Sequence, residues 1–364
     1  MPTRVLVVDD TAIFRKAIAE ALHGVAGIEI VGTANNGSMA LSRIAALRPD
    51  LVTLDIEMPE MNGLEVLEGL RTRGIGTGAI MVSALTSRGG QLTVRALELG
   101  AFDFITKPGL GTAAQNIAAI RNELVPMIRA FERSREIRSI LGGPARPAPA
   151  PAPAPAPRPP EAPTRALRRT GPPIVLIGVS TGGPAALARL LPALPAGLAA
   201  PILIVQHMPP LFTGPLADSL RKKCALPVKE AADGEPALAG HAYIAPGGRH
   251  MKLLPDAKGE PVIRTSDDPP EHNCRPAVDY LFRSAALHFP GRSIAAILTG
   301  MGNDGTDGLR LLKRSGCYSV AQDEASCVVF GMPKEAIAAG VVDLVAPLDA
   351  IAGAIVRSVR ENRV

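Results

Sequence analysis

The segment at residues 5–10 is VLVVDD, four apolar residues followed by two acidic ones. An unbroken apolar run of this length favours a strand that is covered on both faces, as in a parallel sheet. Similar runs follow at 28–34, LVTLD (51–55), IMVS (80–83) and DFITKP (103–108), with helical patterns between them. Alternating strands and helices predict a five-stranded, doubly wound α/β domain with right-handed crossovers.

A segment rich in proline and alanine divides the chain. Residues 144–163 contain ten prolines and seven alanines, a composition that favours extended polyproline II structure and suits a semi-rigid spacer. We therefore expect a first domain at 1–125, whose last helix extends to about 141, then a linker at 142–171 and a second domain at 172–364.

The second half repeats the alternation of strands and helices. Apolar runs at 174–179, 202–205, 294–299 and 319–321 predict another α/β domain built on a parallel sheet. Shorter, turn-rich segments interrupt it between 228 and 266, and we expect a small antiparallel hairpin there, formed by segments such as 241–245 and 262–265.

The charge distribution argues against a nucleic-acid-binding domain. The net charge is 0 over residues 1–141, +4 over 142–171 and +1 over 172–364, so the basic excess lies mainly in the linker. A nucleic-acid interface needs basic residues clustered on a folded domain. Four cysteines without a CxxC pair indicate reduced thiols, and we find neither a signal peptide nor the roughly 20 apolar residues that a membrane span needs. We expect a cytoplasmic protein.

Acidic residues gather at one edge of the first predicted sheet. Asp9 and Asp10 end the first strand and Asp55 ends the third, and the carboxyl ends of parallel strands meet at the ligand crevice of such a sheet. Three carboxylates there need a hard cation such as Mg²⁺. Lys107 and Ser83, which follow two further strands, bring a cation and a hydroxyl to the same edge, so the site is suited to accept a phosphoryl group.

These motifs, VLVVDD, LDIEMPEMNG, VSALT and DFITKP, resemble the receiver domain of bacterial response regulators. The resemblance implies that Asp55 is phosphorylated and that Asp9, Asp10, Asp55 and the main-chain carbonyl of Glu57 bind Mg²⁺. It further implies that Ser83 and Lys107 hold the phosphoryl group. Phe104 stands where receivers often carry a switching aromatic residue.

A candidate nucleophile follows the first strand of the second domain. The run GVSTG at 178–182 fits the G-x-S-x-G pattern, a sharp strand-to-helix turn that exposes the hydroxyl of Ser180. A phosphate-binding turn is the alternative for such a segment. His207, at the end of the next strand, is a candidate base, and a third residue must orient it. Asp304, Asp307 and Asp323 are all candidates, and spacing alone does not separate Asp304 from Asp307.

The runs GVSTGGP, QHMPP, YIAPGG, HNCRPAVD, LTGMGNDG and QDEASCVVFGMP resemble the catalytic domain of protein-glutamate methylesterase. With the receiver, the chain resembles the chemotaxis response regulator methylesterases, the CheB family. The resemblance makes Ser180 the nucleophile, His207 the base and Asp304 its orienting partner, with Thr181 and Met301 near the oxyanion. Asn303 stands where the family commonly has a small apolar residue.

The resemblance implies a phosphorylation-regulated hydrolase that demethylates glutamate methyl esters on chemoreceptors, releasing methanol, and that also deamidates glutamines in some members. Mg²⁺ would serve the receiver, and the esterase reaction would need no cofactor. The expected partners are methylated receptors and a histidine kinase, with membranes involved only through the receptors and the chain acting as a monomer. The alternative is a non-catalytic response regulator whose second domain binds a protein or a nucleotide.

Overall fold

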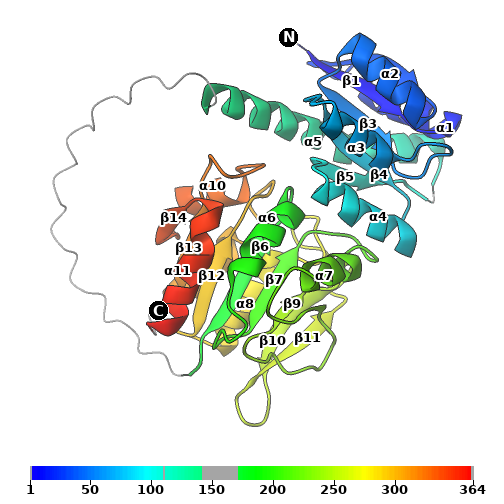
Figure 1. Ribbon diagram of the computed structural model, residues 1–364. Coiled ribbons are helices and arrows are strands. Elements are labelled where there is room, and N and C mark those ends of the chain that lie inside the picture. Colours follow the sequence, from blue (N-terminus) through cyan, green and yellow to red (C-terminus); the bar gives the residue numbers. More distant parts are fainter. Residues whose placement is uncertain (1, 110, 142–170, 362–364) are drawn as a thin grey trace, which may run out of the picture.

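Two parallel sheets, each flanked by helices, form the two domains of the protein (Figure 1). The computed structural model describes residues 2–109, 111–141 and 171–361. Almost all of the predicted linker, 142–170, lies outside the described residues.

The first domain is a five-stranded parallel sheet, as the sequence predicts, and its strand order is β2-β1-β3-β4-β5. Val5 and Val7 pack in one cluster with residues of α1 and α5, whereas Leu6 and Val8 pack on the other face with residues of α2, α3 and α4. The apolar first strand is therefore buried on both faces. The elements are β1 (Thr3–Val8), α1 (Ala12–Leu22), β2 (Ile28–Ala34), α2 (Gly37–Leu47), β3 (Leu51–Asp55), α3 (Gly63–Thr72), β4 (Gly78–Ser83), α4 (Ser87–Glu98), β5 (Asp103–Thr106) and α5 (Ala113–Leu141).

The second domain is a seven-stranded parallel sheet with the order β14-β13-β12-β6-β7-β9-β8. Its central strands, β12, β6 and β7, are fully buried. Its elements are β6 (Ile174–Val179), α6 (Gly183–Leu190), the short 3-10 helix η1 (Leu191–Ala193), β7 (Ile202–Gln206), α7 (Thr213–Arg221), β8 (Val228–Glu230), β9 (Ala242–Ile244), β10 (His250–Pro255), β11 (Pro261–Ser266), α8 (Val278–His288), β12 (Ser293–Ile297), α9 (Thr306–Arg314), β13 (Tyr318–Gln322), α10 (Met332–Ala338), β14 (Leu344–Ala346) and α11 (Leu348–Arg360).

The antiparallel hairpin is present, but one of its two strands differs from the expectation. It is formed by β10 and β11, so the predicted segment 262–265 belongs to it. The other predicted segment, 241–245, instead supplies β9, which pairs in parallel with β7 and β8 in the main sheet. A strand of three residues carries too little pattern to show its partner, and the neighbouring strands decide where it pairs.

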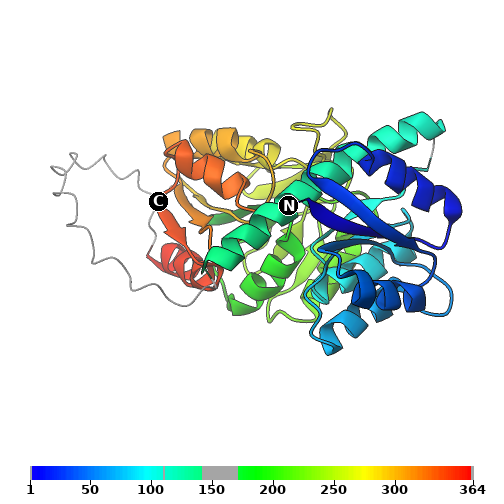
Figure 2. The ribbon, with the colours of Figure 1, turned by 90° about the horizontal axis from the view of Figure 1, so that it is seen from above.

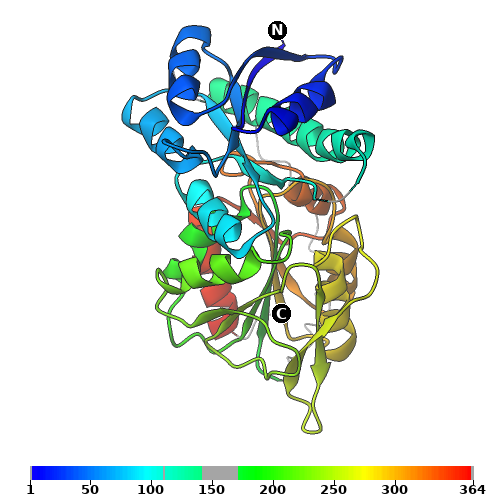
Figure 3. The same ribbon diagram turned by 90° about the vertical axis from the view of Figure 1, so that its right-hand side faces the viewer.

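The receiver-like domain lies directly on the second domain. Helix α4 packs against α6 and α7, an arrangement that Figure 3 shows from the side. The ring of Phe104 stacks on that of Phe212 with 4.8 Å between their centroids, and Glu98 bonds to Lys223 and Ser219 of the α7 region. Seen from above, α5 extends across the second domain (Figure 2). The two domains therefore share a packed interface.

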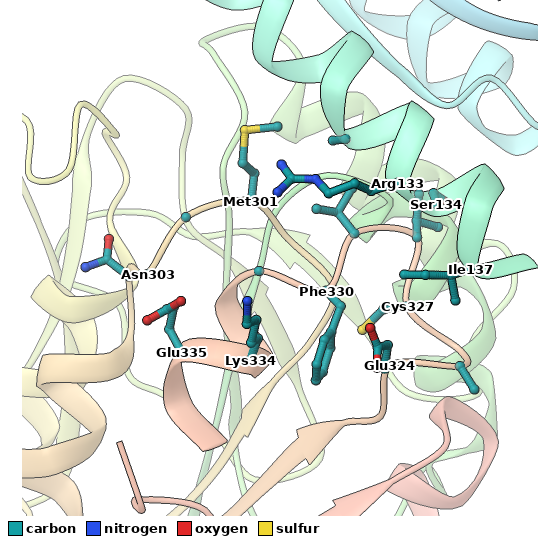
Figure 4. A pocket seen from close by; sticks show the side chains of 16 residues that line it. Arg133, Ser134, Ile137, Met301, Asn303, Glu324, Cys327, Phe330, Lys334 and Glu335 are labelled. Carbon is teal, nitrogen blue, oxygen red and sulfur yellow. The ribbon is translucent and has the colours of Figure 1, made fainter. Parts of the chain in front are cut away.

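A cavity of about 620 Å³ separates α5 from the loops beneath it. Figure 4 shows side chains that line it from α5 (Arg133, Ser134 and Ile137) and from the second domain (Met301 and Phe330). The cavity has walls from both domains, so it exists only while they are docked.

Candidate active site and phosphoacceptor site

Three carboxylates converge at the carboxyl ends of β1 and β3, as predicted. Oxygen atoms of Asp9, Asp10 and Asp55 lie within 4.8 Å of one another. Lys107, just after β5, places its Nζ 2.8 Å from Asp9 Oδ2 and 2.7 Å from Asp55 Oδ2. Asp9 and Asp55 are buried, whereas Asp10 faces solvent. The predicted acidic residues and Lys107 thus lie together at one edge of the sheet.

The charge of this cluster is incompletely balanced by the protein. Burial, together with the neighbouring Asp9, raises the pKa of Asp55 to about 6, although the hydrogen bond from Lys107 acts in the opposite direction. A second cation would relieve this repulsion, and an all-oxygen ligand set is the kind that Mg²⁺ prefers. The residues present therefore fit the ion that the resemblance implies.

The other predicted residues of the receiver make three separate contacts, which involve Ser83, Glu57 and Phe104. The Ser83 hydroxyl accepts a hydrogen bond from the Thr93 hydroxyl at 2.9 Å, which ties it to α4. The Glu57 N–H donates to Asp55 Oδ1 at 3.4 Å. Phe104 is buried in the interface on Phe212. The sheet edge that carries Asp55 is thus connected to the second domain through α4 and through β5.

The turn that carries Ser180 is shaped by two glycines. Gly182 adopts a left-handed conformation with φ at 77° between β6 and α6, which an L side chain rarely adopts. A Cβ added to Gly300 would lie 2.7 Å from Ser180 Cβ, so only glycine lets the 299–302 loop approach this close. Ser180 is therefore fixed on a tight strand-to-helix turn, as its motif predicts, with the N-terminus of α6 behind it.

His207 follows β7 and points to the same edge of the sheet. Its Nε2 lies 2.8 Å from Asp304 Oδ2, and its side chain is 11% exposed. Burial disfavours the imidazolium, but the hydrogen bonds with Asp304 and with Cys274 outweigh it and raise the pKa of His207 above its ordinary value. Among the described residues, no hydrogen bond joins the Ser180 hydroxyl to His207. The histidine is instead engaged by Asp304 and Cys274.

The structure separates the three candidate orienting carboxylates. Asp304 contacts His207 and is buried. Asp307 pairs with Arg310 at the surface, and Asp323 accepts hydrogen bonds from Ser326. Asp304 alone of these three is in contact with His207.

Backbone N–H groups hold Asp304 in its ionised form. Val278 N donates to Oδ2 at 2.7 Å and Asp279 N donates to Oδ1 at 2.8 Å, both from the first turn of α8. Burial alone would raise the pKa of Asp304, but the hydrogen bonds from His207 and from these N–H groups lower it below the usual range. An ionised Asp304 can orient the imidazole and stabilise its cation.

Thr181 and Met301 lie on different sides of this site. Thr181 is buried next to Ser180, and its side chain bonds to Asp103 of the first domain. Met301 lines the 620 Å³ cavity below α5 together with Asn303. Ser180, Thr181 and His207 line a different cavity of about 570 Å³. Met301 therefore does not share the Ser180 cavity in the docked arrangement.

Both domains line the cavity that contains Ser180. Its second-domain wall includes Cys274 and Arg275, and Asp103, Phe104 and Met127 of the first domain close it from the other side. Sequence reasoning did not assign roles to Asp103, His272, Cys274 or Asp279. The run HNCRPAVD contains three of these residues and could have pointed to them. It does not follow a predicted strand, however, so its residues could not be placed at a sheet edge.

Comparisons with known proteins cover both halves. The family model for the CheB methylesterase matches residues 175–355 and that for the response regulator receiver domain matches residues 5–118. A protein-glutamate methylesterase/protein-glutamine glutaminase of Desulfotalea psychrophila is 50% identical over 359 residues, 98% of each chain. The one from Bacillus subtilis is 42% identical over 362 residues, 99% of each chain.

A solved structure extends the comparison to the fold of the second domain. The crystal structure of the Thermotoga maritima CheB methylesterase catalytic domain has 44% sequence identity and a TM-score of 0.50, covering 51% of this chain and 98% of that one. The family models, the near full-length relatives and the geometry of both sites agree. The chain belongs to the CheB methylesterase family, with a receiver domain at its N-terminus.

Proposed function

We propose that this protein hydrolyses glutamate methyl esters, and glutamine amides, on chemoreceptors, and that phosphorylation of Asp55 controls the reaction. The observation that supports it most is the contact of Asp304 with His207, which lines the same cavity as Ser180. The full-length relatives with this domain order are named for the same two activities.

In this proposal Ser180 attacks the γ-carbonyl carbon of the modified glutamate while His207 accepts the hydroxyl proton. The developing oxyanion would be stabilised by main-chain N–H groups near Thr181, at the N-terminus of α6. The proton then passes from His207 to the leaving group, which departs as methanol or, from glutamine, as ammonia. Water, activated by His207, hydrolyses the acyl-enzyme and restores a glutamate carboxylate and the free serine.

We further propose that the docked arrangement is the resting state. Phe104 on Phe212 and Asp103 on Thr181 narrow access to Ser180. A phosphoryl group on Asp55 would be held by Lys107 and the Ser83 hydroxyl. Asp9, Asp10, Asp55 and the carbonyl of Glu57 would hold Mg²⁺, which supplies positive charge against the phosphoryl oxygens. Drawing Ser83 away from Thr93 would alter α4, the helix that contacts α6 and α7.

The remaining parts of the proposal concern the setting of the reaction. The phosphodonor would be a histidine kinase and the substrates methylated receptors, with the chain acting as a cytoplasmic monomer. None of the described helices is both long and apolar enough to cross a bilayer. Access to membranes would then come through the receptors.

The proposal is tested by methanol release from methylated receptor membranes. The wild type treated with a small phosphodonor should release methanol, and Ser180→Ala should lose activity by several orders of magnitude, because removal of a nucleophile disables the whole triad. An undiminished rate for Ser180→Ala would instead favour a second domain that only binds.

A further inference from the structure

A second histidine–carboxylate pair lies behind the catalytic one. His272 Nε2 is 2.9 Å from Asp279 Oδ2 and 4.0 Å from Asp304 Oδ1. The side chains of Asp279 and Asp304 are each 3% exposed, whereas His272 is 32% exposed. His207, Asp304, Asp279 and His272 therefore form a continuous series that leads from the active site toward solvent.

Two helix N-termini hold the two carboxylates reciprocally. Asp304 precedes α9 and accepts from the N–H groups of Val278 and Asp279 in α8. Asp279 belongs to α8 and accepts from the N–H of Gly308 in α9 at 2.6 Å. A Cβ at Gly308 would lie 2.6 Å from Phe282 Cβ, so the helices pack closely here. Each carboxylate thus fixes the position of the other.

This arrangement concentrates negative charge in a buried place. Burial and the neighbouring Asp304 raise the pKa of Asp279 to about 6, although the N–H of Gly308 and the imidazole of His272 act against the rise. Two adjacent ionised carboxylates repel each other unless a cation accompanies them. Among the described residues, His272 is the basic side chain in direct contact with Asp279.

The loop before α8 is built to present this histidine. His272 and the next residue, Asn273, both have positive φ, 51° and 60°. Such conformations are uncommon for residues other than glycine and cluster at functional sites. An antiparallel bridge between Glu271 and Cys274 closes the turn around them. The backbone is therefore held in a form that directs His272 at Asp279.

We propose that His272 is a positioning residue, which as an imidazolium paired with Asp279 keeps Asp304 ionised and thereby sets the basicity of His207. The proposal rests on the proposed esterase function. His272 itself touches neither Ser180 nor the substrate in this mechanism. It acts through Asp279 and Asp304.

Other charged groups face the series of His207, Asp304, Asp279 and His272 from the surrounding elements. None of them is changed in the variants that test the proposal. Glu271 and Arg283 form an ion pair beside Asp279. The remaining groups are Cys274 against His207, Arg275 bonded to the carbonyls of Asp267 and Asp268, the Asp307–Arg310 pair of α9, and Asp103 on Thr181.

The test is the pH profile of methanol release by the full-length chain, with each variant normalised to its own maximum. His272→Gln removes a cation, so His207 binds its proton more tightly and the acidic limb of the profile moves to higher pH. Asp279→Asn removes an anion, so the limb moves to lower pH. The double variant is neutral like the original pair and should return toward the wild-type profile. His288→Gln, at the far end of α8, is the matched control and should leave the limb in place.

Structural damage from two substitutions would add up in the double variant. It would therefore not move the acidic limb in opposite directions in the two single variants and restore it in the double variant. Thermal melting of each variant checks that it is folded. The proposal is overturned if both single variants move the limb in the same direction or neither moves it. Absence of methanol release from the wild type would instead remove the proposed function itself, so the two failures are distinguishable.

Discussion

At the scale of single residues, the choice between Asp304 and Asp307 depends on what each carboxylate accepts. Asp304 uses both oxygens, accepting from His207 and Val278 on Oδ2 and from Asp279 on Oδ1. Asp307, three positions on, faces solvent with Arg310. Asp304 is therefore placed to orient the imidazole of His207, whereas Asp307 is not.

We expect Asp304→Asn to lower the rate of methanol release by roughly 10³ to 10⁴, as is typical when the orienting carboxylate of a triad becomes an amide. Asparagine offers one acceptor oxygen in place of two, so it loses either an N–H of α8 or its contact with His207. Asp307→Asn is the matched control and should keep nearly full activity. Equal rates for the two variants would show that another group orients His207.

The residues of the two sites could be predicted where they follow regular strands. Asp9, Asp55 and His207 each stand at the carboxyl end of a buried apolar run, and parallel strands bring these ends together. Asp304 could be told from Asp307 only through the family resemblance or the structure. His272 and Cys274 come from an irregular loop, whose path is set by tertiary contacts and leaves no periodic pattern in the sequence.

At the scale of elements, α4 is the part of the receiver that meets the catalytic domain most closely. A Cβ added to Gly90 of α4 would lie 2.3 Å from the carbonyl oxygen of Leu211. Leu211 itself has a positive φ of 71°, which is uncommon for a residue other than glycine. The helix and the loop before α7 therefore touch backbone to backbone.

We expect Gly90→Ala to separate the domains without destabilising the receiver. Alanine is favoured over glycine inside a helix by about 1 kcal/mol, whereas its methyl group does not fit against Leu211. The unphosphorylated variant should therefore release methanol several-fold faster than the unphosphorylated wild type. Asp55→Asn, which keeps the interface but lacks the phosphoacceptor, should remain at the basal rate with phosphodonor. An unchanged basal rate for Gly90→Ala would mean that α4 does not control access to Ser180.

The alternation of strands and helices in both domains followed from their apolar runs, but the assignment of the short strands did not. β8, β9 and β14 have three residues each, which is too few for the period of two to identify a buried face. Their places depend on neighbours that are distant in the sequence. This is why residues 241–245 were expected in the hairpin and are found beside β7.

At the scale of the whole molecule, a proline-rich spacer predicts two domains but says nothing of how they dock, because its composition is independent of the surfaces that it connects. The interface brings Asp103, at the start of β5, against Thr181 beside Ser180. A carboxylate thus approaches the place where the reaction would leave a product carboxylate. Docking and catalysis are then both sensitive to the charge of this residue.

The pH dependence of docking follows from the pKa of Asp103. Burial raises this pKa from 3.8 to about 6, although the hydrogen bonds from Thr181 and from the Phe104 N–H favour the carboxylate. Because the docked pKa is above the undocked one, the protonated form docks more strongly. Docking should be strongest below pH 3.8, weaken as the pH rises to about 6, and change little above it.

We therefore expect Asp103→Asn to deepen inhibition at neutral pH, because an amide keeps an acceptor for Thr181 without the burial of a charge. The measurement is the rate of methanol release by the unphosphorylated chain divided by the rate of the same chain carrying Gly90→Ala. Because both chains contain the same His207, this ratio cancels the pH dependence of His207 itself. With the native Asp103 the ratio should rise several-fold between about pH 5 and pH 7, and in the Asp103→Asn variant it should be low and flat. If Asp103→Asn instead raised the ratio at neutral pH, the ionised carboxylate would be an attractive contact, and the receiver would hold the esterase closed through its charge.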